Sequence, residues 1–194
     1  IEHQSGRPVA RARVTAQAIP SRGGGFRPVF TDSRGYFSFE TSQAGAVLLT
    51  AEKRGYAPAY YGQRRWNGPG TPIVVEGDGA FRADIRLRRL GAVSGLVTDE
   101  NGLGLPDVPI FAYRDAAPPR LAGRAAADDR GAFRIGGLEP GRYRIRTGPK
   151  QLEDGAGLLP TYYGDTTVAA GATVVDVNLD DETGNVFIRP LQGT

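Results

Sequence analysis

The stretch RGYAPAYYGQRRWNGPG, residues 54–70, places aromatic rings beside guanidinium groups. Flat rings pack on the apolar faces of sugars, and arginine binds carboxylates through a fixed fork of donors. The same combination of residues binds single-stranded nucleic acid through base stacking and charge. The candidate ligand-binding residues in this stretch are Tyr56, Tyr60, Tyr61, Arg64, Arg65 and Trp66.

The sequence Tyr-Tyr-Gly occurs twice, at 60–62 and at 162–164, and the second occurrence has no arginines behind it. A motif that recurs without its charged neighbours is more typical of a structural role, such as capping a fold or anchoring a long crossover. We therefore expect a structural role first and a glycan-binding site as the alternative. We expect no nucleic-acid partner.

The composition excludes several classes of catalytic and metal site. The chain has no cysteine, so disulfides, thiolate metal sites and a cysteine nucleophile are excluded, and its one histidine is His3. No paired acid and base, nucleophile motif or phosphate-binding loop is visible. We expect no catalytic residues, no metal and no cofactor, so the chain is not predicted to be an enzyme. The acidic run at Asp180–Glu182 indicates a turn between domains, with a weak calcium site as the alternative.

Charge is distributed unevenly along the 194 residues. Residues 1–91 hold 14 basic and 7 acidic side chains, and residues 92–194 hold 10 and 14, so the net charges of +7 and −4 sum to +3. Opposite charges favour attraction between chains or towards neighbouring domains. Two unrelated solvated surfaces are the simpler interpretation. No apolar run reaches the length of about 20 residues that a membrane helix needs, so no membrane span is expected.

The sequence repeats itself at a spacing of about 96 residues. DSRGYF at 32–37 aligns with DDRGAF at 128–133, and the same offset aligns Gly45 with Gly141. Further on, the Tyr-Tyr-Gly motifs align at an offset of 102, and DIRL at 84–87 aligns with DVNL at 176–179 at an offset of 92. Copies of about 95 residues are long enough to bury separate cores, which predicts two tandem domains.

Each copy has the pattern of short strands. RYRIRT at 142–147 alternates between arginines and core-type residues, and Gly 28 and Pro 14 supply many turns, while no window has a helical period. In the repeated motif, we expect the aspartate to accept backbone amides and Gly35 and Gly131 to supply the positive φ of a hairpin. Phe37 and Phe133 should then enter the core. These features predict an all-β sandwich or barrel.

The second copy, with VSGLVTDENGLGLPDVPIFAYR followed by DDRGAFRIGGLEPGRYRIR, resembles the carboxypeptidase regulatory-like domain over most of 92–179. The first copy matches more weakly and begins inside its first strand. The resemblance implies two tandem prealbumin-like Greek-key β-sandwiches. It also implies non-catalytic modules of secreted or surface proteins of bacteria, or modules appended to enzymes and outer-membrane receptors.

These observations predict a domain at 1–91 with an incomplete first strand and a second domain at 92–182. Residues 183–194 form either the start of a further repeat, an added edge strand on the second copy, or a strand that fills the vacant position of the first copy. The function expected is a structural or interaction module of a larger extracytoplasmic or cell-surface protein, a location inferred from the resemblance alone. Its partners would be neighbouring domains of the same polypeptide, with protein or glycan as further partners. The alternative is a carbohydrate-binding module that uses the loop around Trp66.

Overall fold

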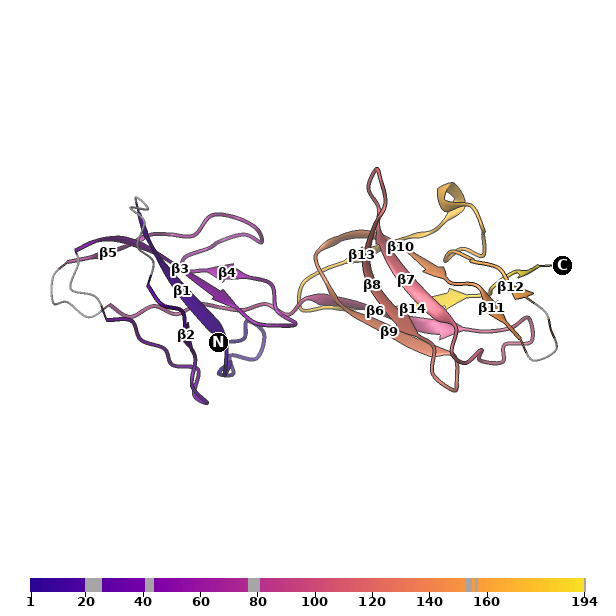
Figure 1. Cartoon of the computed structure of the whole chain (residues 1–194), viewed down its shortest axis with the longest axis horizontal. Coiled ribbons are helices and arrows are strands. Elements are labelled where there is room, and N and C mark those ends of the chain that lie inside the picture. Colours follow the sequence, from indigo (N-terminus) through magenta and orange to yellow (C-terminus); the bar gives the residue numbers. More distant parts are fainter. Residues whose placement is uncertain (20–25, 41–43, 77–80, 153–154, 156, 194) are drawn as a thin grey trace. The chain divides into compact units, whose positions relative to one another are not determined.

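The computed structural model describes residues 1–19, 26–40, 44–76, 81–152, 155 and 157–193 (Figure 1). Within these ranges the regular structure is β-strand, apart from one 3-10 turn at Ala169–Gly171. The chain divides into two compact units, Ile1–Arg89 and Leu90–Thr194. The all-β class expected from the sequence is confirmed.

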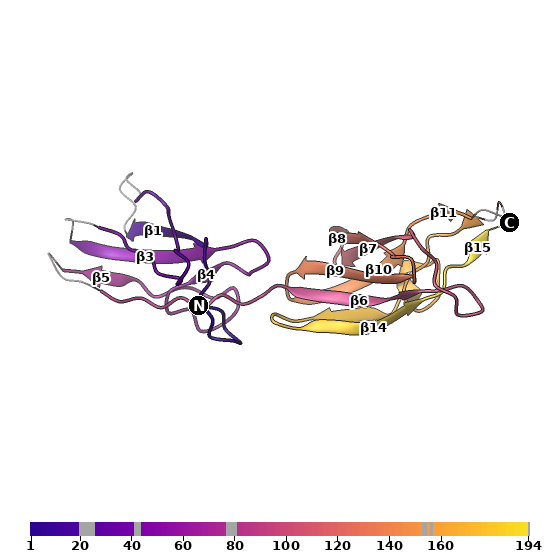
Figure 2. The same ribbon diagram turned by 90° about the horizontal axis from the view of Figure 1, so that it is seen from below.

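The second unit is a sandwich of two main sheets. One has the order β13-β10-β7-β8 and the other the order β14-β6-β9, in which β14 runs parallel to β6 and the remaining neighbours are antiparallel. Figure 2 shows β14, β6 and β9 side by side in one layer. Three short strands, β11, β12 and β15, form a small additional sheet. The bounds are β6 (Gly91–Val97), β7 (Pro109–Arg114), β8 (Arg120–Ala126), β9 (Ala132–Leu138), β10 (Gly141–Thr147), β11 (Lys150–Gln151), β12 (Gly157–Leu158), β13 (Val174–Val177), β14 (Glu182–Ile188) and β15 (Gln192–Gly193).

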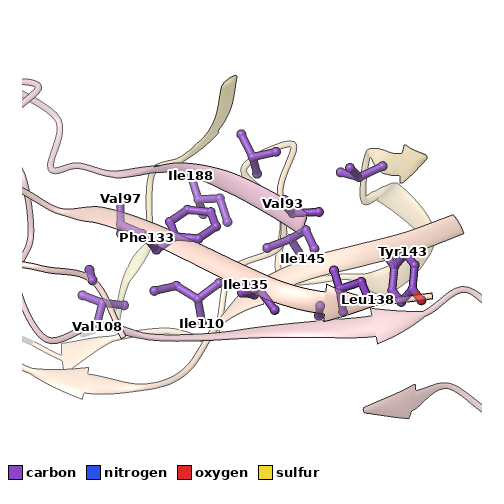
Figure 3. Close-up of a cluster of buried hydrophobic side chains, with 14 of the residues drawn as sticks. Val93, Val97, Val108, Ile110, Phe133, Ile135, Leu138, Tyr143, Ile145 and Ile188 are labelled. Carbon is purple, nitrogen blue, oxygen red and sulfur yellow. The ribbon is translucent and has the colours of Figure 1, made fainter. Parts of the chain in front are cut away.

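The core of this unit lies between the two sheets, because alternate residues of each strand point to opposite faces. Tyr143 and Ile145 of β10 are buried, as the alternation of 142–147 predicts, and they meet Phe133 and Ile135 of β9. Figure 3 shows these side chains in a cluster with Val93 of β6. Burial of such apolar surface is the main source of stability of the unit.

The first unit has a core of its own, built mainly on one sheet. That sheet has the order β2-β1-β3-β4, and β5 also pairs with β3. The opposite layer includes Glu2, which pairs in parallel with Leu87, so these residues take the places that β6 and β14 hold in the second unit. The bounds are β1 (Arg13–Ile19), β2 (Val29–Phe30), β3 (Gly45–Glu52), β4 (Ala59–Tyr60) and β5 (Ile73–Val75).

The repeated D-x-R-G-x-F motif forms the same turn in both units. Asp32 Oδ1 accepts the amides of Arg34 and Tyr36 at 2.8 and 2.9 Å, and Asp128 Oδ1 accepts those of Arg130 and Ala132 at 2.9 and 2.8 Å. Gly35 and Gly131 have φ values of 77° and 78°, as expected. Phe133 is buried, and Phe37 packs partly buried against the first core.

The position of this turn in the fold differs from the prediction. In the second unit it joins β8 to β9, which belong to different sheets, so it is a corner between layers and not a hairpin within one sheet. A tight turn carries the chain across the thickness of a sandwich as readily as between paired strands. Local turn chemistry therefore does not specify the pairing of the flanking strands.

The alignment of 84–87 with 176–179 is wrong. Gly45 pairs with Val75 in the first unit as Gly141 pairs with Val177 in the second, so β5 and not 84–87 is the counterpart of β13. Residues 84–87 misaligned because neighbouring strands share the same apolar alternation. Residues 182–188 form β14, which is the arrangement described by the edge-strand alternative, and its Val186 and Ile188 are buried in the second core. Asp180 and Asp181 accordingly lie between β13 and β14, and Glu182 is the first residue of β14, so the acidic run lies within the second unit and not between domains.

Candidate functional site

The candidate loop begins after β4 and returns to β5, and its first residues anchor it to the sheet. The Tyr61 amide donates to Leu49 O at 3.0 Å, and the Thr71 amide donates to Tyr61 O at 2.7 Å. In the second unit, Tyr163 donates to Ile145 O and Thr173 donates to Tyr163 O, both at 2.8 Å. Tyr-Tyr-Gly thus anchors the crossover in both units, which is the structural role that its repetition predicts.

The Tyr61 ring faces the first core. It packs against the buried cluster and meets the Phe81 ring edge-on at a centroid distance of 5.8 Å. Phe81 itself is 55% exposed. Tyr61 therefore presents only part of its ring to solvent.

Replacing Tyr61 by alanine is expected to lower the free energy of unfolding by about 2 kcal/mol, because a partly buried aromatic ring and its edge contact are lost. Urea denaturation measures this change. Arg65→Ala, an exposed position in the same loop, is the matched control and should shift the free energy by less than about 0.5 kcal/mol. A larger loss for Arg65→Ala than for Tyr61→Ala would contradict the structural role of Tyr61.

Tyr56 belongs to a different cluster. Its hydroxyl donates to Glu2 Oε1 at 3.4 Å, and the Arg89 guanidinium lies 5.5 Å from the centre of its ring. The Glu2 carboxylate also accepts hydrogen bonds from Ser5 and Arg89, and Glu2 is buried. This cluster fixes the bridge between Glu2 and Leu87, and no local sequence pattern marks it because Glu2 and Arg89 lie 87 residues apart.

Hydrogen bonds from Ser5 and Arg89 hold the pKa of Glu2 below its usual value. A carboxyl whose pKa is lower in the folded state stabilises the fold above its unfolded pKa, about 4.3 for Glu, and the contribution is lost as pH falls through the folded pKa. We expect Glu2→Gln to lower the melting temperature of the first unit at pH 7 and to flatten its decline below about pH 4.3. Thermal denaturation between pH 7 and pH 3 measures both effects.

Glu52→Gln is the control for Glu2→Gln, because Glu52 pairs with Arg13 at 3.4 Å and both side chains are about half exposed. An exposed pair contributes little to stability. Equal losses of melting temperature for the two variants would contradict the role assigned to Glu2.

Arg64 and Arg65 lie at one shallow hollow of about 310 Å³. Trp66 is 36% exposed, and Tyr60 pairs with Thr50 in the sheet while its amide donates to Gln63 at 3.1 Å. The hollow is lined by Gly62, Arg64, Arg65, Gly68, Pro69, Gly70 and Thr71. The structure thus brings two of the six predicted residues together at this hollow, and the four aromatic rings do not join them there.

The other polar side chains that could take part in catalysis or ligand binding instead hold the backbone. Lys53 Nζ donates to Ala10 O, and Lys150 Nζ donates to Pro106 O, which are matching contacts in the two units. Glu182 of the acidic run forms an ion pair in which its Oε2 lies 2.9 Å from Arg134 Nε. In the described ranges, no group of three or more His, Cys, Asp or Glu is placed to hold a metal ion. The described helical structure includes no segment long and apolar enough to cross a membrane.

Residues 1–88 match the family model described as the carboxypeptidase regulatory-like domain. The matched region lies in the first unit, the copy in which the sequence motifs predicted the weaker resemblance. No curated protein matches the chain.

Among solved structures, three matches cover nearly the whole of this chain. The minor pilin GBS52 of Streptococcus agalactiae is 14% identical, with a TM-score of 0.48 over 100% of this chain and 88% of that one. The shaft pilin SpaA of Lactobacillus rhamnosus GG is 12% identical, with a TM-score of 0.44 over 97% of this chain and 90% of that one. The Bacillus anthracis TIE protein is 11% identical, with a TM-score of 0.41 over 98% of this chain, which spans only 32% of that protein.

Proposed function

We propose that the chain is a pair of tandem carboxypeptidase regulatory-like domains. In this proposal they serve as non-catalytic structural or interaction modules of a larger bacterial protein, outside the cytoplasm or at the cell surface. The match over residues 1–88 supports the assignment of the first domain. The assignment of the second domain is supported by the register of its strands. Thr15 pairs with Thr50 in the first unit, and the residues 96 positions further along, Phe111 and Arg146, pair with each other in the second.

One observation supports the non-catalytic role. Lysine and aspartate side chains, which could take part in catalysis, hold the backbone at matching positions in both units. Lys53 donates to Ala10 O just before β1, and Lys150 donates to Pro106 O just before β7. Asp32 and Asp128 each accept two backbone amides in the repeated turn. Groups used in this way serve the fold, and a module of this kind acts by connecting or presenting surfaces to neighbouring domains of its polypeptide.

The glycan-binding alternative at the loop around Trp66 lacks a supporting arrangement. A sugar platform needs exposed ring faces next to hydrogen-bond donors. Tyr56 contacts Glu2 and Arg89, and Tyr61 packs against the core. The hollow at Arg64 and Arg65 offers charge without aromatic rings.

The proposal is tested by locating the native protein in the cells that make it. An antibody raised against the purified 194-residue chain should detect a polypeptide longer than this chain. That polypeptide should fractionate outside the cytoplasm and be cut by protease added to intact cells. Detection in the cytoplasmic fraction alone, protected from external protease, would contradict the proposed location.

A further inference from the structure

The outer face of the sheet β13-β10-β7-β8 carries a cluster of arginines and aromatic rings. Ile110 and Ala112 of β7 and Tyr143 and Ile145 of β10 point into the core, so the residues alternating with them point outward. The outward residues, together with a tyrosine of the neighbouring crossover, are half-buried and form what we call the arginine–aromatic face: Phe111, Tyr113, Arg144, Arg146 and Tyr162.

Arg146 is held between two rings of this face. Its guanidinium carbon lies 5.2 Å from the centre of the Tyr113 ring and 5.6 Å from that of Tyr162. Its Nη2 also donates to the Tyr113 hydroxyl at 3.3 Å, and the centres of the Phe111 and Tyr113 rings lie 6.3 Å apart. A side chain that is already ordered loses little further rotamer freedom when it binds a partner.

The two arginines of this face and the adjacent Arg142 outnumber the neighbouring carboxylates, which are Asp115 and the register partner of Arg142, Asp176. Arg144 Nη1 lies 2.6 Å from Asp115 Oδ1, and Arg142 Nη2 lies 3.7 Å from the other oxygen of the same carboxylate. The Nε atoms of Arg144 and Arg146 are buried and have no acceptor among the described residues. These guanidinium groups are therefore partly desolvated and incompletely compensated, so an incoming carboxylate gains an interaction at a reduced desolvation cost.

The first unit shows that the fold does not need these residues. The pairs Phe111–Arg146 and Tyr113–Arg144 of the second unit correspond in register to Thr15–Thr50 and Gln17–Leu48 of the first. The first sheet forms with uncharged residues at all four positions. The arginine–aromatic face of the second unit thus has no counterpart at these four positions of the corresponding sheet in the first unit.

We infer that the arginine–aromatic face binds an acidic segment of a protein partner in extended conformation. Arg142, Arg144 and Arg146 alternate along one strand, which spaces them by about 6.8 Å, the same spacing as alternate carboxylates on an extended chain. Tyrosine and arginine are the residues that dominate the centres of protein interfaces. A sugar is the weaker candidate because Arg146 covers ring faces of Tyr113 and Tyr162 that a sugar would use. This inference rests on the proposed function, because it names the partner of the interaction module.

The test measures binding of fluorescent poly-L-glutamate to the full chain by anisotropy at about 0.15 M salt. The variant Arg144→Leu with Arg146→Thr installs the residues of the first unit, so the sheet should still form. We expect its affinity for poly-L-glutamate to fall at least about tenfold, because charge-assisted hydrogen bonds are lost.

Arg82→Leu with Arg86→Thr is the matched control, since it removes two exposed charges from the first unit. It should change the affinity by less than about twofold, as expected for rim or distant charges. An equal loss for both double variants would overturn the inference, because binding would then follow net charge alone.

Two further results would also overturn the inference. One is the absence of poly-L-glutamate binding by the unaltered chain. The other is tighter binding of polygalacturonate with the same dependence on Arg144 and Arg146, which would make the occupant an acidic polysaccharide. If the second-unit variant fails to fold, the inference is tested by the reverse substitutions in the first unit. A second poly-L-glutamate site should then appear in the variant that carries Thr15→Phe, Gln17→Tyr, Leu48→Arg and Thr50→Arg. These outcomes are independent of the cellular location of the protein, which tests the proposed function separately.

Discussion

Replacing Gly131 by alanine is expected to lower the free energy of unfolding of the second unit by about 3–4 kcal/mol. Gly131 has a φ of 78°, where an L-residue is strained. A Cβ at this position would lie 2.3 Å from the carbonyl oxygen of Val97 and 2.8 Å from the Cα of Gly104. Both neighbours are backbone atoms and do not yield as a flexible side chain does. Relief of the clash would stretch the hydrogen bond of 2.8 Å that the Val97 amide donates to Gly131 O.

Gly102→Ala separates the two causes of this loss. Gly102 has a similar φ of 82°, and a Cβ there would meet nothing within 4 Å. Only the cost of the positive φ applies, so we expect a loss of about 1 kcal/mol. Urea denaturation of both variants measures the difference. Equal losses would mean that the corner between β8 and β9 tolerates a side chain and that the packing described for it is wrong.

The same corner shows what could be predicted from the sequence. Asp128, Gly131 and Phe133 specify a turn through interactions within six residues, and each behaves as predicted. The sheet that receives the strand after the turn is chosen by contacts between residues far apart in the chain. For this reason the turn was correctly expected, while its place between two sheets was not.

The candidate site was less predictable for a similar reason. Tyr56 and Tyr61 stand five positions apart, yet one contacts Glu2 and Arg89 and the other contacts the core and Phe81. Spacing along a loop does not determine which rings share a surface. The arginine–aromatic face gave a partial signal, because the alternation of 142–147 predicts outward arginines. The partners Tyr113 and Tyr162 become neighbours of Arg146 only through strand pairing and the crossover.

Ile145→Ala is expected to lower the free energy of unfolding of the second unit by about 3–4 kcal/mol, since a fully buried isoleucine would leave a cavity. Ile145 packs in one hydrophobic cluster, and the corresponding Leu49 packs in another. Native-state hydrogen exchange should therefore lose protection within residues 90–194 and retain it within 1–89. Leu49→Ala should give the reverse pattern, with a loss of about 2–3 kcal/mol because Leu49 is 7% exposed.

Arg142→Ala provides the control for Ile145→Ala on the same strand. Its side chain is 65% exposed, so the substitution should change protection by less than about 0.5 kcal/mol. The comparison separates the packing of the inner face of β10 from any general weakening of the strand. If Ile145→Ala and Leu49→Ala each reduced protection across all 194 residues, the two clusters would act as one cooperative core, and the chain would have to be treated as a single folding unit.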